Sequence, residues 1–266
     1  MKLDRYIAVE GEKPLDILLE DGGFTSIFRT IGCVGDSLSS GEFEGKRSED
    51  APNSYHDFYE YSWGQFIARR TGSKVYNFSR GGMTAKEYME SFAEKNDFWA
   101  EDKKCQAYIF ALGVNDILHC KMPIGDIEDI DLDDYTKNKD TFCGYYAAII
   151  QRLKLIQPRA KFFLMSMPRD VNREHDEAKR LHAELLYKLA ELFDNTYVLD
   201  FFKYAPVYDE DFQRRFYLAG HLNPMGYKLT ADMVMSYIDY IIRSDPESFL
   251  QVGFIGTDFY HYRFKY

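Results

Sequence analysis

Short apolar segments alternate with longer segments of helical periodicity along most of this chain of 266 residues. A strand buried on both faces reads as a nearly continuous apolar run, and such runs separated by helices are typical of a parallel sheet covered on both sides. The pattern therefore predicts a doubly wound α/β fold whose sheet has five parallel strands. These strands are expected at residues 26–35, 74–79, 107–113, 161–167 and 196–202.

Four helices are expected between and after these strands. A glycine follows the first helical segment and a proline closes the second, and both residues commonly mark helix ends. The last helix has the clearest start, because Asn223 can cap it and Pro224 can be its first residue, where the missing N–H costs nothing. The four helices are predicted at residues 55–72, 133–158, 174–194 and 223–244.

The domain organisation follows from the continuity of this pattern. No internal repeat, low-complexity tract or Pro/Ser-rich linker interrupts it, so residues 1–266 are expected to form a single domain with its core at about 26–244. An extension at residues 1–25 precedes the core, and an aromatic tail at residues 245–266 follows it. Either extension could overhang a site, but covering a sheet edge is the more common use of such segments.

Charge and cysteine content narrow the range of functions. A formal charge of -10 and a pI near 5.2 argue against nucleic acid or an anionic membrane as the partner, because both demand clustered Lys and Arg. The charged first residues do not read as a signal peptide, so a cytoplasmic location is expected. The cysteines lack CxxC spacing, so neither a disulfide framework nor a zinc site is indicated, and no cofactor is expected. The cysteines are Cys33, Cys105, Cys120 and Cys143.

Polar residues follow several of the predicted strands directly. In doubly wound sheets, ligands bind beyond the carboxyl ends of the strands, so these segments should meet on one rim. Each has an ordinary structural explanation when taken alone: serine often caps helices, paired glycines mark turns, and asparagine forms Asx-turns. The segments are Gly35-Asp36-Ser37-Leu38, "NFSRGGMT" at 77–84, "GVND" at 113–116 and "GHLNPMGY" at 220–227.

Together and in this order, the four segments resemble the signature blocks of the SGNH (GDSL) hydrolase family. The resemblance extends from residue 30 to about residue 242. The G-x-S-x-G motif of the α/β-hydrolases is absent, because Ser39 stands where its second glycine would fall. The resemblance implies a flavodoxin-like, three-layer α/β/α sandwich and an esterase that acts through a serine nucleophile.

The resemblance also assigns roles to individual residues. Ser37 would be the nucleophile, and His221 the general base that takes its proton. The oxyanion hole would consist of the backbone N–H groups of Ser37 and Gly82 and the side-chain amide of Asn115. The other histidines lack a partner motif, and a metal site at two of them has only a weak basis in their spacing. These are His56, His119, His175, His182 and His261.

The sequence departs from the family pattern at one position. Family members usually carry an aspartate three residues before the histidine, and Leu218 stands there in this chain. A neutral acceptor is the favoured partner of His221, because orienting an imidazole requires an acceptor but no charge. A carboxylate from elsewhere and a degenerate site are the alternatives. The candidate carboxylates by location are Asp200, Asp209, Glu210 and Asp211.

The expected substrate is a small-molecule or saccharide ester. Short acyl groups such as acetyl on carbohydrate are favoured, because the chain has 21 Tyr and 21 Phe that could stack on sugars and no apolar run resembling a lipase lid. A lysophospholipase, thioesterase or lipase-like carboxylesterase is the alternative among enzymes. A non-catalytic carbohydrate-binding protein on the same scaffold, an acyl transferase and a homo-oligomeric state also stay open.

Overall fold

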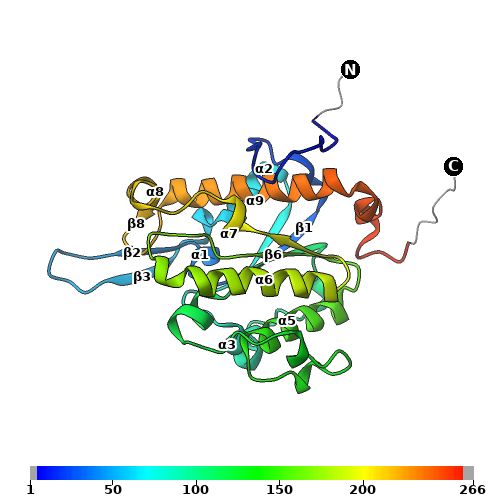
Figure 1. Cartoon of the computed structure of the whole chain (residues 1–266), viewed down its shortest axis with the longest axis horizontal. Coiled ribbons are helices and arrows are strands. Elements are labelled where there is room, and N and C mark those ends of the chain that lie inside the picture. Colours follow the sequence, from blue (N-terminus) through cyan, green and yellow to red (C-terminus); the bar gives the residue numbers. More distant parts are fainter. Residues whose placement is uncertain (1–4, 260–266) are drawn as a thin grey trace.

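A computed structural model describes residues 5–259 of the chain, and a parallel sheet of five strands lies at its centre (Figure 1). The strand order is β4-β1-β5-β6-β7, as in flavodoxin-like folds. All five strands lie where they were predicted, but the first begins at Thr30 because residues 23–27 form a 3-10 helix, η1. The strands are β1 (Thr30–Gly35), β4 (Lys74–Ser79), β5 (Ala107–Ala111), β6 (Lys161–Met165) and β7 (Thr196–Leu199).

Helices cover both faces of the sheet, which confirms the three-layer architecture (Figure 1). Neighbouring residues of β1 show the alternation: Cys33 packs in the core beneath α2 and α9, and Val34 packs in the core on the side of α5 and α6. None of the helices within residues 5–259 is both long and apolar enough to cross a membrane. The covering helices are α2 (Trp63–Thr71), α3 (Ala85–Glu87), α4 (Ala93–Lys95), α5 (Phe142–Ile156), α6 (Asp176–Leu192) and α9 (Pro224–Ser244).

The helix α9 begins as the sequence predicts. The Asn223 side chain accepts a hydrogen bond from the backbone N–H of Gly226 at 3.0 Å, and Pro224 is the first helical residue. Two other helices start later than predicted: α2 at Trp63 and α5 at Phe142. In both cases a serine or threonine directly before the helix caps it, and the polar residues upstream fold separately.

Two antiparallel strand pairs were not predicted. The hairpin of β2 (Glu42–Gly45) and β3 (Ser54–Asp57) projects from the body of the molecule, and β8 (Tyr217–Leu218) pairs with β9 (His221–Leu222) beside it (Figure 1). The acidic, glycine-flanked β2 has little intrinsic strand propensity, which explains why it was missed. Further short helices include α1 (Ser37–Ser40), α7 (Phe201–Tyr204), α8 (Glu210–Phe216) and the π-helical η5 (Val114–His119).

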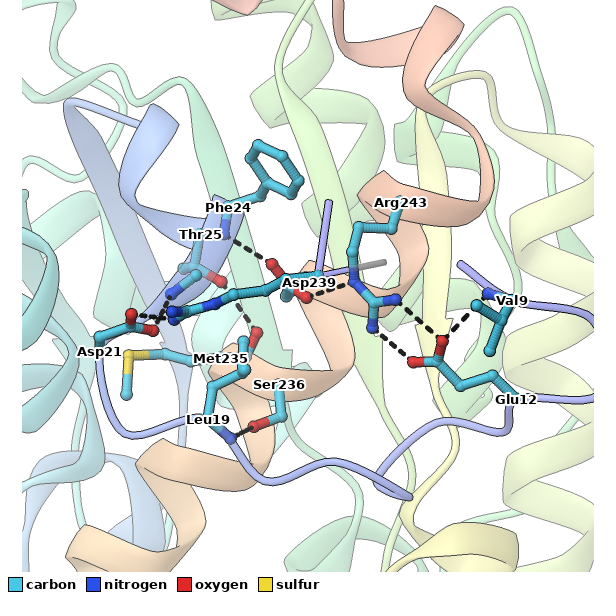
Figure 2. Close-up of polar contacts among 12 residues, drawn as sticks. Val9, Glu12, Leu19, Asp21, Phe24, Thr25, Met235, Ser236, Asp239 and Arg243 are labelled. Atoms are coloured by element: carbon cyan, nitrogen blue, oxygen red, sulfur yellow. Dashed lines mark hydrogen bonds and ion pairs between the residues drawn. The ribbon is translucent and has the colours of Figure 1, made fainter. Parts of the chain in front are cut away.

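The N-terminal extension packs along α9 and not on a sheet edge (Figure 2). The Arg243 guanidinium donates to Glu12 at 2.9 Å and to Asp239 at 2.7 Å, and all three side chains are about 95% buried. Further along the extension, the backbone N–H of Leu19 donates to the Ser236 hydroxyl at 2.8 Å. The extension is therefore fixed by buried polar contacts to the helix face that points away from the sheet.

The C-terminal segment lies at the amino ends of the strands. Because α9 runs antiparallel to the strands, the chain leaves it at that end, where η9 (Pro246–Phe249) and η10 (Val252–Phe254) follow. The Gln106 amide, directly before β5, donates to the carbonyl of Val252 at 3.0 Å. The tail was expected at a sheet edge or over the site. Its described part does neither, and residues 260–266 lie outside the described part of the chain.

Candidate active site

The four segments singled out in the sequence meet at the carboxyl end of the sheet. Ser37 begins α1 after β1, Gly82 follows β4, Asn115 lies in η5 after β5, and His221 begins β9. All four line one cleft with a volume of about 430 Å³. The parallel topology brings them together, because the carboxyl ends of β4, β1 and β5 are neighbours in the sheet.

Ser37 stands at a tight turn between β1 and α1. The Asp36 side chain caps α1 by accepting a hydrogen bond from the backbone N–H of Leu38 at 3.1 Å. The turn needs glycine at position 35, because a Cβ there would lie 2.1 Å from the Ser39 hydroxyl oxygen. Asp36 therefore caps α1, and Ser37 and Leu38 of this helix line the cleft.

Gly82 and Asn115, the two further residues expected in the oxyanion hole, are held by local geometry. Gly82 has a φ of 71°, which favours glycine, whereas a Cβ there would meet no atom within 4 Å. Backbone conformation and not crowding therefore explains this glycine. The Asn115 amide donates to the carbonyl of Met83 at 3.0 Å and makes a long contact of 3.5 Å with Asp36. The first bond fixes the amide, and the second is weak enough to be replaced by a substrate oxygen.

Two carboxylates from β2 flank the His221 ring. The Glu44 Oε1 atom lies 2.8 Å from Nδ1, and the Glu42 Oε1 atom lies 3.1 Å from Nε2. Residues two apart on a strand point to the same face, so both side chains reach His221 together. All three side chains are mostly buried, with exposed fractions of 16% for His221, 12% for Glu42 and 10% for Glu44.

The expectation of a neutral partner for His221 is wrong in this structure, because the acceptor at Nδ1 is the Glu44 carboxylate. The alternative that a carboxylate arrives from elsewhere in the chain fits the geometry. Leu218 is half exposed and lies opposite His221 in the β8–β9 pair. The sequence did contain a signal, since the "EFEG" segment directly after α1 places two acids on one strand face, but a strand had not been predicted there.

The four carboxylates proposed from the sequence have other surroundings. Asp200 accepts hydrogen bonds from a serine hydroxyl and a tyrosine hydroxyl, each at 3.1 Å. Asp209 caps α8, Glu210 is exposed in the first turn of that helix, and Asp211 pairs with two arginines of the same helix. None of the four is the partner that the structure gives to His221 Nδ1.

Ser37 and His221 border the same cleft without being hydrogen-bonded to each other. Among the described residues, no hydrogen bond joins the Ser37 hydroxyl to the imidazole, and Nε2 faces Glu42 instead. A general base must present one unprotonated ring nitrogen to the serine. In the observed geometry, the ring nitrogen that would accept the serine proton is occupied by the Glu42 carboxylate.

Two buried carboxyl groups belong to Asp36, which precedes Ser37, and to Asp116, which follows Asn115. Burial raises the pKa of Asp36 to about 7, although the N–H of Leu38 acts in the opposite direction. Burial likewise raises the pKa of Asp116 to about 6, and the backbone N–H of Ala85 donates to that carboxyl at 2.8 Å. Both carboxyl groups therefore titrate close to neutral pH.

The rest of the cleft combines aromatic, apolar and charged side chains. The buried Lys179 ammonium pairs with Asp170 at 2.6 Å, and His119, which had no role in the sequence prediction, lies on the wall. His182 is fully buried in the core, and burial lowers its pKa to about 4. No cluster of His, Cys, Asp and Glu suited to a metal ion occurs within residues 5–259. Other lining residues are Leu38, Tyr55, Val114, Leu118, Met167, Pro168, Tyr208 and Tyr217.

The fold is similar to solved esterase structures. A family two carbohydrate esterase from Clostridium thermocellum, in complex with cellohexaose, has a TM-score of 0.57 at 17% identity, covering 88% of this chain and 67% of that chain. A G-D-S-L family protein from Desulfitobacterium hafniense has a TM-score of 0.51 at 17% identity, with 79% and 99% covered. A family 3 carbohydrate esterase from Clostridium thermocellum has a TM-score of 0.51 at 15% identity, with 80% and 96% covered. Identities this low establish the fold alone.

The sequence itself matches a family model. A search of curated proteins gave no match. Residues 33–229, however, match the model of the GDSL-like Lipase/Acylhydrolase family. This span contains all four signature segments and all of their proposed site residues. Because this match covers well over half of the chain, the protein belongs to the GDSL-like lipase/acylhydrolase family.

Proposed function

We propose that this protein is a serine esterase that cleaves carboxylic esters through an acyl-enzyme on Ser37. The Ser37 hydroxyl oxygen attacks the ester carbonyl carbon and gives its proton to His221 Nε2, while the carbonyl oxygen becomes an oxyanion. Collapse of this intermediate releases the alcohol, which takes the proton from His221. Water then attacks the acyl-enzyme and passes a proton to His221, the acid leaves, and Ser37 regains its proton.

The arrangement of Ser37, Gly82, Asn115 and His221 around one cleft carries this proposal. The N–H groups of Ser37 and Gly82 and the Asn115 amide are suited to stabilise the oxyanion, since preorganised donors act strongly in a site that excludes water. The Glu44 carboxylate at Nδ1 supplies the acceptor that a catalytic imidazole requires. Family membership supports acyl-ester chemistry on the same residues.

We propose short acyl esters of carbohydrate as the substrate class. The cleft is large enough for a small ligand. Its wall carries the exposed Tyr55 and the partly buried Tyr217, whose rings can stack on a sugar and whose hydroxyls can bond to it. Two solved structures with the same fold bear carbohydrate esterase in their names. A longer acyl chain is the second candidate, because Val114, Leu118 and others give the wall an apolar part.

Covalent labelling tests the serine chemistry directly. A fluorophosphonate should modify the folded wild-type protein at Ser37, as read by mass spectrometry of the labelled peptide, and Ser37→Ala should abolish the label. Ser40→Ala is the matched control, because Ser40 is a buried neighbour in the same short helix and should leave labelling at Ser37 intact. An unlabelled wild-type Ser37 would contradict catalysis and favour a carbohydrate-binding protein.

Chain-length preference tests the substrate. Activity on p-nitrophenyl acetate well above that on the octanoate ester, together with release of acetate from an acetylated oligosaccharide, is the expected result. The opposite preference would favour a lipase-like or thioesterase activity. Adding a free sugar acceptor and analysing the products separates hydrolysis from acyl transfer.

A further inference from the structure

We propose that the two glutamates of β2 have opposite effects on the catalytic histidine: Glu44 positions His221 for catalysis, and Glu42 holds Nε2 in an inhibited state. The proposal rests on the esterase function proposed above. It concerns residues outside the signature blocks of the family, on a strand that the sequence pattern did not reveal. It depends on the contrast between the ways in which the two side chains are held.

Glu44 is a fixed acceptor. Its Oε1 atom lies 2.8 Å from His221 Nδ1 and also accepts a hydrogen bond from the backbone N–H of Gly220 at 3.0 Å. Its other oxygen has a contact of 3.5 Å with the Asn53 amide. A Cβ at position 220 would come within 2.4 Å of Oε1, so this approach also depends on a glycine. A backbone donor, a glycine and a strand thus hold the carboxylate in one place.

The consequence for His221 is a defined tautomer. An acceptor at Nδ1 keeps a proton on that nitrogen, and in the neutral imidazole the other nitrogen is then the base. Glu44 does not contact the reacting atoms in this mechanism. It acts through the ring, in the position that an acid three residues before the histidine occupies in the family pattern.

Glu42 is held differently. Among the described residues, the polar partner of its carboxylate is His221 Nε2 alone, at 3.1 Å. Its backbone carbonyl is anchored separately, because the Tyr227 hydroxyl donates to it at 2.7 Å. Rotation of the side chain would therefore release Nε2 without disturbing β2. Glu44, with its additional backbone donor, has no comparable freedom.

The contact of Glu42 with Nε2 opposes catalysis in two ways. One proton is shared between Nε2 and the carboxylate, and whichever group holds it, the nitrogen lone pair cannot accept the proton of Ser37. The carboxylate also packs against Gly81, the residue before the oxyanion donor Gly82, since a Cβ at Gly81 would clash with Oε2. A negative charge beside a developing oxyanion disfavours it. Entry of the ester into the cleft would turn Glu42 aside and release its shared proton to solvent.

Two isosteric substitutions separate the roles. Glu44→Gln should lower kcat on p-nitrophenyl acetate by about ten- to a hundredfold with little change in KM, because the positioning charge is lost. Glu42→Gln should raise kcat/KM and the rate of phosphonate labelling at Ser37 by about threefold or more, because a neutral amide competes less well for Nε2. Glu49→Gln is the matched control, since Glu49 is exposed in the loop between β2 and β3.

The outcomes that overturn the proposal are equally specific. A Glu42→Gln enzyme with unchanged or lower kcat/KM overturns the inhibitory role, and a Glu44→Gln enzyme with wild-type kcat overturns the positioning role. If Glu44→Gln fails to fold, Glu44→Asp replaces it, and its shorter side chain should also lower kcat.

A spectroscopic measurement keeps this proposal distinct from the proposed function. The proton NMR spectrum of the wild-type protein should contain a downfield His221 Nδ1–H resonance that Glu44→Gln shifts or removes and that Glu49→Gln retains. This readout requires no activity. Its absence from the wild type overturns the positioning role, whereas a wild-type Ser37 that resists labelling overturns the esterase function.

Discussion

The buried Asp36 carboxyl predicts a specific dependence of stability on pH. Its pKa of about 7 in the folded protein lies above the ordinary value of 3.8, chiefly because burial disfavours the charged form. Between these two values the folded state binds more protons than the unfolded state. The free energy of unfolding should therefore fall as the pH rises from about 4 to about 7, and Asp36 should contribute no further change above that range.

The size of the effect follows from the difference between the two pKa values. About 3 pH units at 1.36 kcal/mol each correspond to about 4 kcal/mol of lost stability. The neighbouring Asp116, with a pKa raised by burial to about 6, adds a loss of the same sign. A comparison with Asp36→Asn isolates the first group, because asparagine can still cap α1 but has no charge to bury. Its amide must face the Asn115 amide, which costs about 1 kcal/mol at every pH.

Urea unfolding at a series of pH values measures this difference. The intrinsic fluorescence of the buried Trp63 reports the transition. The stability of Asp36→Asn relative to the wild type should increase by about 2 to 4 kcal/mol from pH 4 to pH 8. A relative stability that stays constant over this range would show that Asp36 ionises as it does in the unfolded chain, and would refute the argument from burial.

Three further predictions concern the oxyanion hole, the acid and the N-terminal extension. Asn115→Ala should lower kcat by two to three orders of magnitude, about 2.7 to 4 kcal/mol, with labelling of Ser37 slowed in parallel. Adding Leu218→Asp to Glu44→Gln should raise kcat at least tenfold above that of Glu44→Gln alone, because residues 218 and 221 are directly opposed in the strand pair and lie within side-chain reach. A double variant as slow as Glu44→Gln would contradict this. Glu12→Gln should destabilise the protein by about 3 kcal/mol in urea unfolding while kcat stays unchanged, and a loss of kcat would show that the extension affects the cleft.

The sequence sufficed for the sheet and for the four segments on its rim because both depend on local signals. A buried parallel strand is an apolar run, and the residue after it is at the carboxyl edge whatever the rest of the chain does. The positions of Ser37, Gly82, Asn115 and His221 follow from this rule together with the signature blocks.

The partner of His221 could not be found in this way. Glu44 precedes it by 177 residues, and the two meet only because the β2–β3 hairpin folds back beside the β8–β9 pair. Strand propensity gave no indication of β2, because Glu and Gly are depleted in strands. This strand forms only because its tertiary pairing overrides the low propensity of these residues. The carboxylates that the sequence indicates instead lie nearer to His221 in the chain, such as Asp200 and Asp209, and these have their own hydrogen-bond partners.

The position of the acid changes how the site is assembled. An acid three residues before the histidine is positioned by the histidine's own loop, whereas Glu44 is positioned by the chain segment that also carries Ser37. Residues 37–45 thus supply the proposed nucleophile, the acceptor for Nδ1 and the carboxylate on Nε2. The Tyr227 hydroxyl ties this segment to α9, whose start follows His221 directly. Any movement of the segment would shift both partners of the imidazole at once, so the alignment of base and nucleophile depends on the short strand β2 as much as on the central sheet.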